Sequence, residues 1–297
     1  MALYSEFNYI TDSRNNLTYT VDMIRLKCFI TFEKFSYLEF ILKTCYNSFI
    51  DKDYVSTAFS DFRYNYTIKI NDNSSFWFGY FPNSEKINKG GVSNPNTPHN
   101  FTIEFNPNKV KIAGFLKFVI DYIPFYSWEI KSCDIAIDIP TNILNICGFD
   151  KKRYKDIRVF TCGGDNKTIY IGRTQNRIKI YNKKIESGLD YDLTRLEVST
   201  KLDLKLSTYL NFFNLVVPLP DLFLNDYLVD IFNLSDKTLV ALVFAVNNGY
   251  NINDLPRVQK EKVRNLFHSS DERIPFDNCF VNSVFHKCVD YIFHLKD

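Results

Sequence analysis

The chain has 297 residues, of which 45% are hydrophobic and 16% aromatic, and its formal net charge is +2 at pH 7. This composition supports a sizeable core and excludes global disorder. The seven cysteines are odd in number and include no Cys-x-x-Cys pair, which argues against a disulfide framework and a structural zinc site. With no signal-peptide pattern and no apolar run near the roughly 20 residues of a membrane span, we expect a cytoplasmic protein without a membrane partner.

In the first half of the chain, hydrophobic periodicity predicts strands and two helices. Residues 21–33 alternate as a strand, and Phe35–Phe49 follow as an amphipathic helix. Two alternating runs within residues 62–81 predict a hairpin, and Lys89–Asn100, rich in Gly, Asn and Pro, predicts a loop. After a strand at residues 101–105, apolar positions from Ile112 to Ile123 predict a second helix.

The second half begins with strands and ends with helices. The predicted strands are Trp128–Ile139, Thr168–Gly172, Arg177–Lys183 and Thr194–Lys201, the middle two joined by a hairpin turn. From Ser235 the period becomes helical. We therefore expect an α+β fold: a largely antiparallel sheet with helices on one face, plus a C-terminal helical part. Pro218 and Pro220 place the predicted boundary between a sheet-rich region, 1–217, and a helical region, 218–297.

One predicted strand carries a tyrosine among cations. In Arg177–Lys183, Ile178 and Ile180 point to one face, whereas Arg177, Lys179, Tyr181 and Lys183 point to the other. A tyrosine can act as a covalent nucleophile, and neighbouring cations favour its phenolate and hold a phosphate. Tyr181 is therefore a candidate catalytic nucleophile, although it is also one of 19 tyrosines in an aromatic-rich protein.

Acidic residues on two further strands suggest a metal site. Asp134 and Asp138 share a strand face with the small Ala136 between them, and Glu197 is a third possible ligand from another strand. Carboxylates with water suit Mg²⁺ or Mn²⁺, which would polarise a phosphate. Arg195, on the face of Glu197, is a candidate phosphate contact, as are Arg177, Lys179 and Lys183. The alternative is an ordinary solvent-facing set of acids.

Charge and missing motifs narrow the possible functions. The segment Asp150–Lys201 holds 13 Lys and Arg against 7 Asp and Glu, a net of +6 in a chain of net +2. Such a segment fits a phosphate-backbone footprint or a solvated face. The absence of a His-x-His pair disfavours a histidine-paired metal nuclease, and the absence of a Gly-x-x-x-x-Gly-Lys-[Ser/Thr] loop disfavours a nucleotide-driven motor.

At these residues the chain resembles the Rep_trans family of plasmid replication-initiation proteins, which covers rolling-circle initiators and related conjugative relaxases. The resemblance spans about residues 21–201. The segments that carry it are Cys133–Asp138, Thr168–Gly172, Arg177–Lys183 with Glu186, and Arg195–Glu197.

The resemblance implies a metal-dependent, site-specific DNA nicking-closing enzyme, an endonuclease and strand transferase. Its tyrosine, matching Tyr181, would attack an origin phosphodiester, stay joined to the 5′ phosphate and free a 3′ hydroxyl. The acidic ligands would map to Asp134 or Asp138 and Glu197. The expected partners are single-stranded or cruciform origin DNA, a helicase and a second copy of the chain. Tyr170 and Tyr191 are nearby candidates for a second cleavage. A conjugative relaxase and a non-catalytic DNA-binding protein remain alternatives.

Overall fold

The structure is a computed structural model of the chain. It describes residues 3–51, 61–71, 74–82, 96–147, 157–161, 166–172, 176–209, 213–224, 235–247, 250, 252–268 and 273–295. Most of the predicted loop Lys89–Asn100 and most of the predicted turn at residues 173–176 lie outside the described residues.

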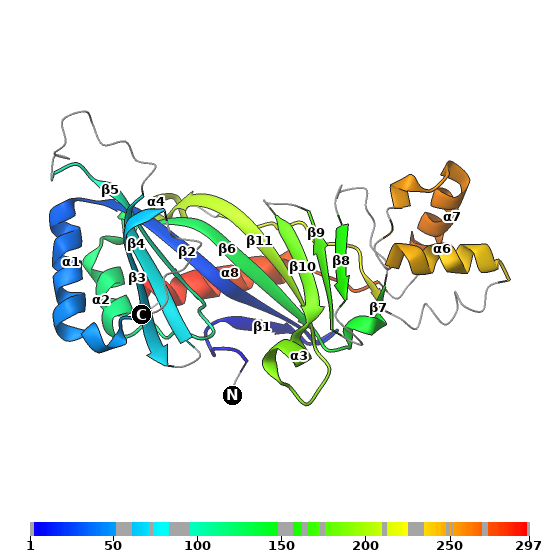
Figure 1. The fold of residues 1–297 in the computed structure, drawn as a ribbon, viewed down its shortest axis with the longest axis horizontal. Coiled ribbons are helices and arrows are strands. Elements are labelled where there is room, and N and C mark those ends of the chain that lie inside the picture. Colours follow the sequence, from blue (N-terminus) through cyan, green and yellow to red (C-terminus); the bar gives the residue numbers. More distant parts are fainter. Residues whose placement is uncertain are drawn as a thin grey trace.

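A large antiparallel sheet dominates the fold, as the sequence predicts (Figure 1). Its spatial order is β3-β4-β5-β2-β6-β11-β10-β9-β8, with β1 paired to one end of β2. The strands are β1 (Tyr9–Asp12), β2 (Leu17–Ile30), β3 (Phe62–Asn71), β4 (Ser74–Pro82), β5 (His99–Phe105), β6 (Glu129–Ile139), β8 (Ile157–Thr161), β9 (Lys167–Ile171), β10 (Arg177–Asn182) and β11 (Thr194–Lys205). β7 (Ile146–Cys147) and β12 (Phe223–Leu224) form a separate pair.

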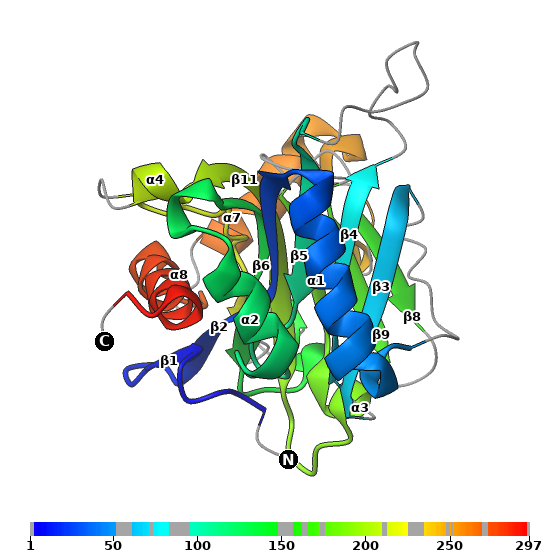
Figure 2. The same cartoon turned by 90° about the vertical axis from the view of Figure 1, so that its left-hand side faces the viewer.

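Three helices, α1 (Phe32–Cys45), α2 (Gly114–Tyr122) and α8 (Asn278–Phe293), lie along the sheet. Figure 1 shows α8 behind the strands, and Figure 2 shows α1 and α2 in front of them. Phe35 of α1 stacks on Tyr80 of β4, and Phe280 of α8 stacks on Tyr19 of β2. The fold is thus α+β, with these helices covering one face of the sheet.

The covered face is apolar because strand alternation gathers its side chains in cross-strand rows. In one row, antiparallel registers align Ile169, Ile180, Leu196, Ile137 and Tyr19, all fully or almost fully buried. Burying each such aliphatic side chain contributes about 1.5–3 kcal/mol. The same alternation leaves the intervening residues of these strands on the opposite face.

The structure differs from the sequence prediction where β10 ends. The strand stops at Asn182, and Lys183 begins α3 (Lys183–Ser187) instead of continuing the strand. The Asn182 side chain accepts a hydrogen bond from the Ile185 backbone N–H and caps the helix. Gly188, at φ 63°, ends it in the left-handed conformation. The sequence also gave no indication of β8.

The C-terminal helices divide between two clusters. α6 (Lys237–Asn247) and α7 (Arg257–His268) pack around Val243, Val246 and Val263, at one end of the molecule in Figure 1. α8 instead joins the main core, with Phe285 fully buried. The division at residue 218 stays a prediction. The other helical elements among the described residues are α4 (Leu206–Tyr209) and four 3₁₀ turns, at Asn47–Phe49, Phe125–Ser127, Ile143–Asn145 and Ile252–Asp254. None of the described helices is long and apolar enough to cross a membrane.

Candidate active site

Predicted site residues from three strands meet on the sheet face opposite α1, α2 and α8, which we call the polar face. The registers of β10, β11 and β6 place them in three adjacent rows, which are Tyr181–Arg195–Asp138, Lys179–Glu197–Ala136 and Arg177–Ser199–Asp134. Directly opposite side chains in a sheet have Cβ atoms about 4.5–5.5 Å apart. The alternation in the sequence therefore brings together all the predicted site residues except Lys183.

Tyr181 is almost buried, with 6% of its surface exposed, and its phenol donates a 2.6 Å hydrogen bond to Oε1 of Glu197. The Lys179 ammonium lies 3.8 Å from the centre of the tyrosine ring and 3.8 Å from Oε2 of Glu197. Burial and the Glu197 carboxylate raise the pKa of Tyr181 well above its usual range. The expectation that Arg177, Lys179 and Lys183 favour the phenolate is therefore wrong for the resting site, because burial and Glu197 outweigh the cations. A base must take the phenolic proton, and Glu197 is already in contact with it.

Two carboxyl groups of the polar face, those of Asp134 and Glu197, have raised pKa values. Burial raises the pKa of Asp134 to about 6, and the charges of Glu197, Asp22 and Glu104 add to the shift, opposed by a hydrogen bond with Ser199. Burial and Asp22 also raise the pKa of Glu197. Burial is the largest cause of both shifts, because it disfavours the charged form of a carboxyl group.

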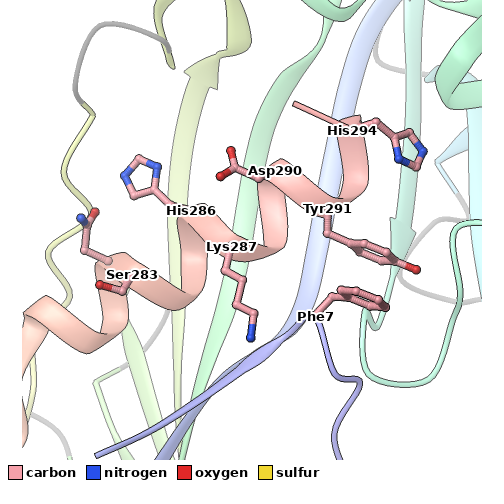
Figure 3. A pocket seen from close by; sticks show the side chains of 8 residues that line it. Phe7, Ser283, His286, Lys287, Asp290, Tyr291 and His294 are labelled. Carbon is pink, nitrogen blue, oxygen red and sulfur yellow. The ribbon is translucent and has the colours of Figure 1, made fainter. Parts of the chain in front are cut away.

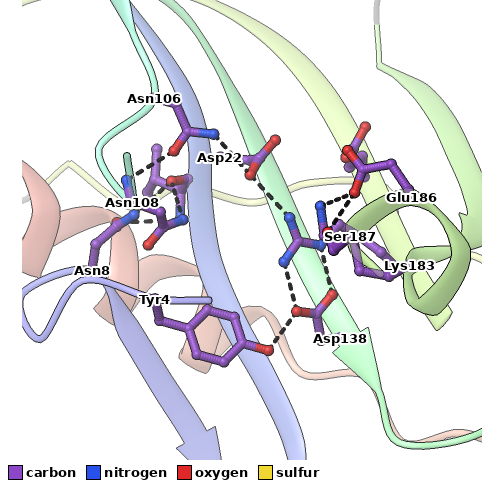
Figure 4. A network of polar contacts seen from close by, with 12 residues as sticks. Tyr4, Asn8, Asp22, Asn106, Asn108, Asp138, Lys183, Glu186 and Ser187 are labelled. Carbon is purple, nitrogen blue, oxygen red and sulfur yellow. Dashed lines mark hydrogen bonds and ion pairs between the residues drawn. The ribbon is translucent and has the colours of Figure 1, made fainter. Parts of the chain in front are cut away.

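Asp138 and Arg195 form a buried ion pair, each side chain at most 3% exposed. Arg195 donates to both carboxylate oxygens of Asp138, from Nε at 2.6 Å and from Nη2 at 2.7 Å, and its Nη1 lies 3.0 Å from Asp22. Tyr4, from the segment before β1, donates to Oδ2 of Asp138 at 2.5 Å (Figure 4). Arg195 is thus held by two carboxylates, which leaves it poorly placed to contact a phosphate.

A β-bulge in β2 directs Asp22 toward this site. The pairing with β6 shifts between Val21 and Met23, so Asp22 is the extra residue. Asn8 satisfies the displaced backbone by donating to the Val21 carbonyl and accepting from the Val21 N–H. Asn106 donates to Asp22 at 3.2 Å (Figure 4). These amide side chains fix the bulge and thereby the position of Asp22.

The other predicted phosphate contacts have different surroundings. Lys183, the first residue of α3, is buried and pairs with Glu186 (Figure 4), while its ammonium lies 5.8 Å from the Tyr181 ring centre. Arg177 is exposed and lies over the ring of Tyr170 at 5.5 Å. Arg177 and Lys179 are therefore better placed than Lys183 to meet a phosphate on the polar face.

The predicted metal ligands fit a divalent ion only in part. Within the described part of the chain, no three His, Cys, Asp or Glu side chains are arranged to hold an ion. Both oxygens of Asp138 are engaged by Arg195, so Asp138 does not fit the role of a ligand. Asp134 and Glu197 fit better, because they occupy adjacent rows of the polar face and the charge of Glu197 acts on Asp134. Mg²⁺ often binds through one or two carboxylates together with water and a substrate phosphate.

A depression of about 500 Å³ lies along α8, away from the predicted residues (Figure 3). His286 is part of its lining, and both ring nitrogens are hydrogen-bonded, Nδ1 with the Tyr209 hydroxyl at 2.5 Å and Nε2 with the Phe213 carbonyl at 2.8 Å. Phe7 stacks on Tyr291 at its edge (Figure 3). These contacts tie α8 to neighbouring segments and explain this histidine without a catalytic role.

Tyr4, Asp22 and Glu104 also belong to this site and were not predicted from the sequence. Asp22 had a detectable signal, because the apolar alternation of Leu17, Tyr19 and Val21 resumes out of phase at Ile24. Tyr4 had none, since it contacts a residue 134 positions away.

No protein-family model matches the sequence, and a search of curated proteins gives no match. Among solved structures, a rolling circle replication initiator protein from Geobacillus stearothermophilus is similar over 85% of this chain and 97% of that chain. Its identity is 12% and its TM-score 0.34, a similarity too low to assign a family or a function.

Proposed function

We propose that this chain is a DNA nicking-closing enzyme that initiates rolling-circle replication through a tyrosine nucleophile. The observation that carries the proposal is the hydrogen bond from the Tyr181 phenol to Glu197, on a sheet face that also presents Lys179 and Arg177. A nucleophile paired with a base, next to cations that hold phosphate, is the minimum set for covalent phosphodiester cleavage.

In the proposed reaction, the Tyr181 oxygen attacks the scissile phosphorus and its proton passes to Glu197. The bond from phosphorus to the 3′ oxygen breaks, and that oxygen takes up a proton from solvent water to become a free 3′ hydroxyl. The 5′ phosphate stays esterified to Tyr181. Closing is the reverse: a 3′ hydroxyl attacks the phosphotyrosine, and the proton returns to the phenol.

Asp134 and Glu197 are the residues we propose for a divalent ion, and Asp138 is left out. When bound, such an ion would supply Lewis-acid polarisation of the phosphate. Lys179 would place one non-bridging phosphate oxygen near Tyr181, and Arg177 would bind the next phosphate along the strand. Arg195 would act indirectly, by holding Asp138 and Asp22 in place.

The test is cleavage of single-stranded oligonucleotides from the DNA flanking the gene, labelled at either end, with Mn²⁺ or EDTA. A 3′-labelled strand should become covalently attached to the protein, whereas a 5′-labelled strand should only shorten. Tyr181→Phe should abolish both signals. Tyr126→Phe, at an exposed tyrosine in the 3₁₀ turn Phe125–Ser127, is the matched control and should react normally.

A second candidate is a non-catalytic DNA-binding protein, which the burial of Tyr181 favours, since 6% exposure limits approach of a phosphate. Binding without any adduct, on substrates that include supercoiled origin DNA, would support it. An initiator and a conjugative relaxase share this chemistry, and neighbouring transfer genes would indicate the latter.

A further inference from the structure

Two aromatic side chains continue the polar face beyond Tyr181 toward the sheet edge. The registers of β9 and β8 extend the first row through Thr168 to Phe160, and the second row through Tyr170 to Arg158. Because successive residues of a strand alternate, Phe160, Tyr170 and Tyr181 all lie on the same face.

Phe160 is 57% exposed. Its ring packs edge to face with the ring of Tyr170, with 5.8 Å between the ring centres and 81° between the ring planes. The guanidinium of Arg177 lies 5.5 Å from the Tyr170 ring centre. Tyr170 is thus held between a cation and Phe160, while Phe160 keeps most of its surface open to solvent. This packing fixes an exposed aromatic ring in position before any ligand arrives.

Cations surround the two rings. Arg158 is exposed beside Tyr170 on β8, Arg177 contacts Tyr170 directly, and Lys179 follows on β10. Exposed aromatic rings between cations are what a single nucleic-acid strand needs, because bases stack on rings while phosphates meet Lys and Arg. A base-paired duplex cannot offer its base faces in this way.

We propose that Phe160 is a base-stacking residue for single-stranded DNA, held in place by Tyr170, with Arg158 and Arg177 binding the flanking phosphates. This proposal rests on the proposed function, for which it defines the substrate strand. Phe160 lies two strands from Tyr181, roughly 10 Å at about 4.8 Å per strand. A strand stacked as closely as in a duplex, at about 3.4 Å per nucleotide, spans that length with about three nucleotides, and a more extended strand needs fewer, so the stacked base lies within about three positions of the scissile phosphate.

The experiment measures binding in EDTA, so that it is independent of cleavage. Oligonucleotides from the flanking DNA carry 2-aminopurine at successive positions, and affinity is measured as a function of salt. Phe160→Ala should weaken single-strand binding about 5- to 100-fold and abolish fluorescence quenching at one position. Phe160→Trp should bind like the wild type. Arg158→Gln should instead reduce the salt slope by about 0.7.

Phe40→Ala is the matched control, because Phe40 is 61% exposed on α1, on the other side of the sheet. The proposal is overturned if Phe160→Ala binds single strands like Phe40→Ala, or if its duplex affinity falls equally. It is also overturned if Phe160→Ala changes only the oligomeric state, since the exposed ring would then belong to an interface between copies. Normal binding and nicking by Phe160→Ala would refute the stacking role alone. A stacking signal without any nicking by the wild type would refute the proposed function alone.

Discussion

The Tyr181 phenol donates a 2.6 Å hydrogen bond to the Glu197 carboxylate across adjacent strands. In the proposed mechanism, this contact would let a tyrosine with a raised pKa act as a nucleophile, because the acceptor of its proton is in place before the phosphate arrives. It also changes the role expected for Glu197, which the sequence suggested only as a metal ligand.

Replacing Glu197 by Gln should slow nicking about 10²- to 10⁴-fold, because the amide keeps the shape but cannot take the phenolic proton. Single-turnover cleavage across a pH series measures this, and the deficit should shrink at high pH as hydroxide substitutes for the base. Asp192→Asn, which alters an exposed carboxylate paired with Lys184, should have little effect. Wild-type rates for Glu197→Gln at neutral pH would remove Glu197 from the mechanism.

Asp134 should make the protein less stable as the pH rises. Its folded pKa of about 6 exceeds the unfolded value of 3.8, so between these values the folded state binds the proton that the unfolded chain has lost. The free energy of unfolding therefore falls as the pH rises through this window, by on the order of 1–3 kcal/mol, and stays lower at pH 7. Urea unfolding at a series of pH values measures this. The free energy of unfolding of Asp134→Asn should vary less with pH than that of the wild type, and it should be greater at pH 7.

The same variant tests the proposed metal site without any activity assay. Millimolar Mn²⁺ should raise the melting temperature of the wild type, because an ion that binds only the folded state stabilises it. Asp134→Asn should lose most of this increase, whereas Asp192→Asn should keep it. Equal increases in all three proteins would place the ion elsewhere.

The pKa of Glu197 is also raised, so Glu197 contributes to the pH dependence of the unfolding free energy in the same direction as Asp134.

The Arg195–Asp138 pair should be important for stability. Asp138→Asn leaves the buried guanidinium without most of its compensating charge and should cost about 3–5 kcal/mol of unfolding free energy. The exposed Lys184–Asp192 pair offers a contrast, since disrupting it should cost at most about 1 kcal/mol. Denaturant unfolding measures both. A loss under 1 kcal/mol for Asp138→Asn would mean that Asp22 alone can hold Arg195.

The sequence predicts the polar face because strand alternation and antiparallel pairing are local rules. Once Arg177–Tyr181 and Arg195–Glu197 form neighbouring strands, their polar residues must share a face. Alternation accounts for the polar faces of these strands, whereas the pairing of β11 with β6, which brings Asp134 onto the same face as Tyr181 and Glu197, is a long-range contact.

Other features depend on contacts that no local pattern encodes. The direction of the Tyr181 pKa shift follows from the depth of burial, which the strand sequence does not give. Tyr4 reaches Asp138 from a distant segment. Lys183 was predicted on the strand, yet Asn182 as a helix cap and Gly188 as a stop were readable signals for α3. β8 is five residues long, too short for its alternation to be distinctive.

Phe285→Ala should lower the free energy of unfolding of the main sheet by about 3–5 kcal/mol, because this fully buried ring of α8 belongs to the main core. The prediction separates α8 from α6 and α7, although the sequence assigned all three to one helical region. Denaturant unfolding followed by tryptophan fluorescence measures it, since Trp77 and Trp128 both lie in or beside the sheet. Phe40→Ala, at an exposed phenylalanine, is the control and should change stability by less than about 0.5 kcal/mol. If Phe285→Ala instead leaves this transition unchanged, the sheet folds without α8, and the boundary near residue 218 separates two independent units.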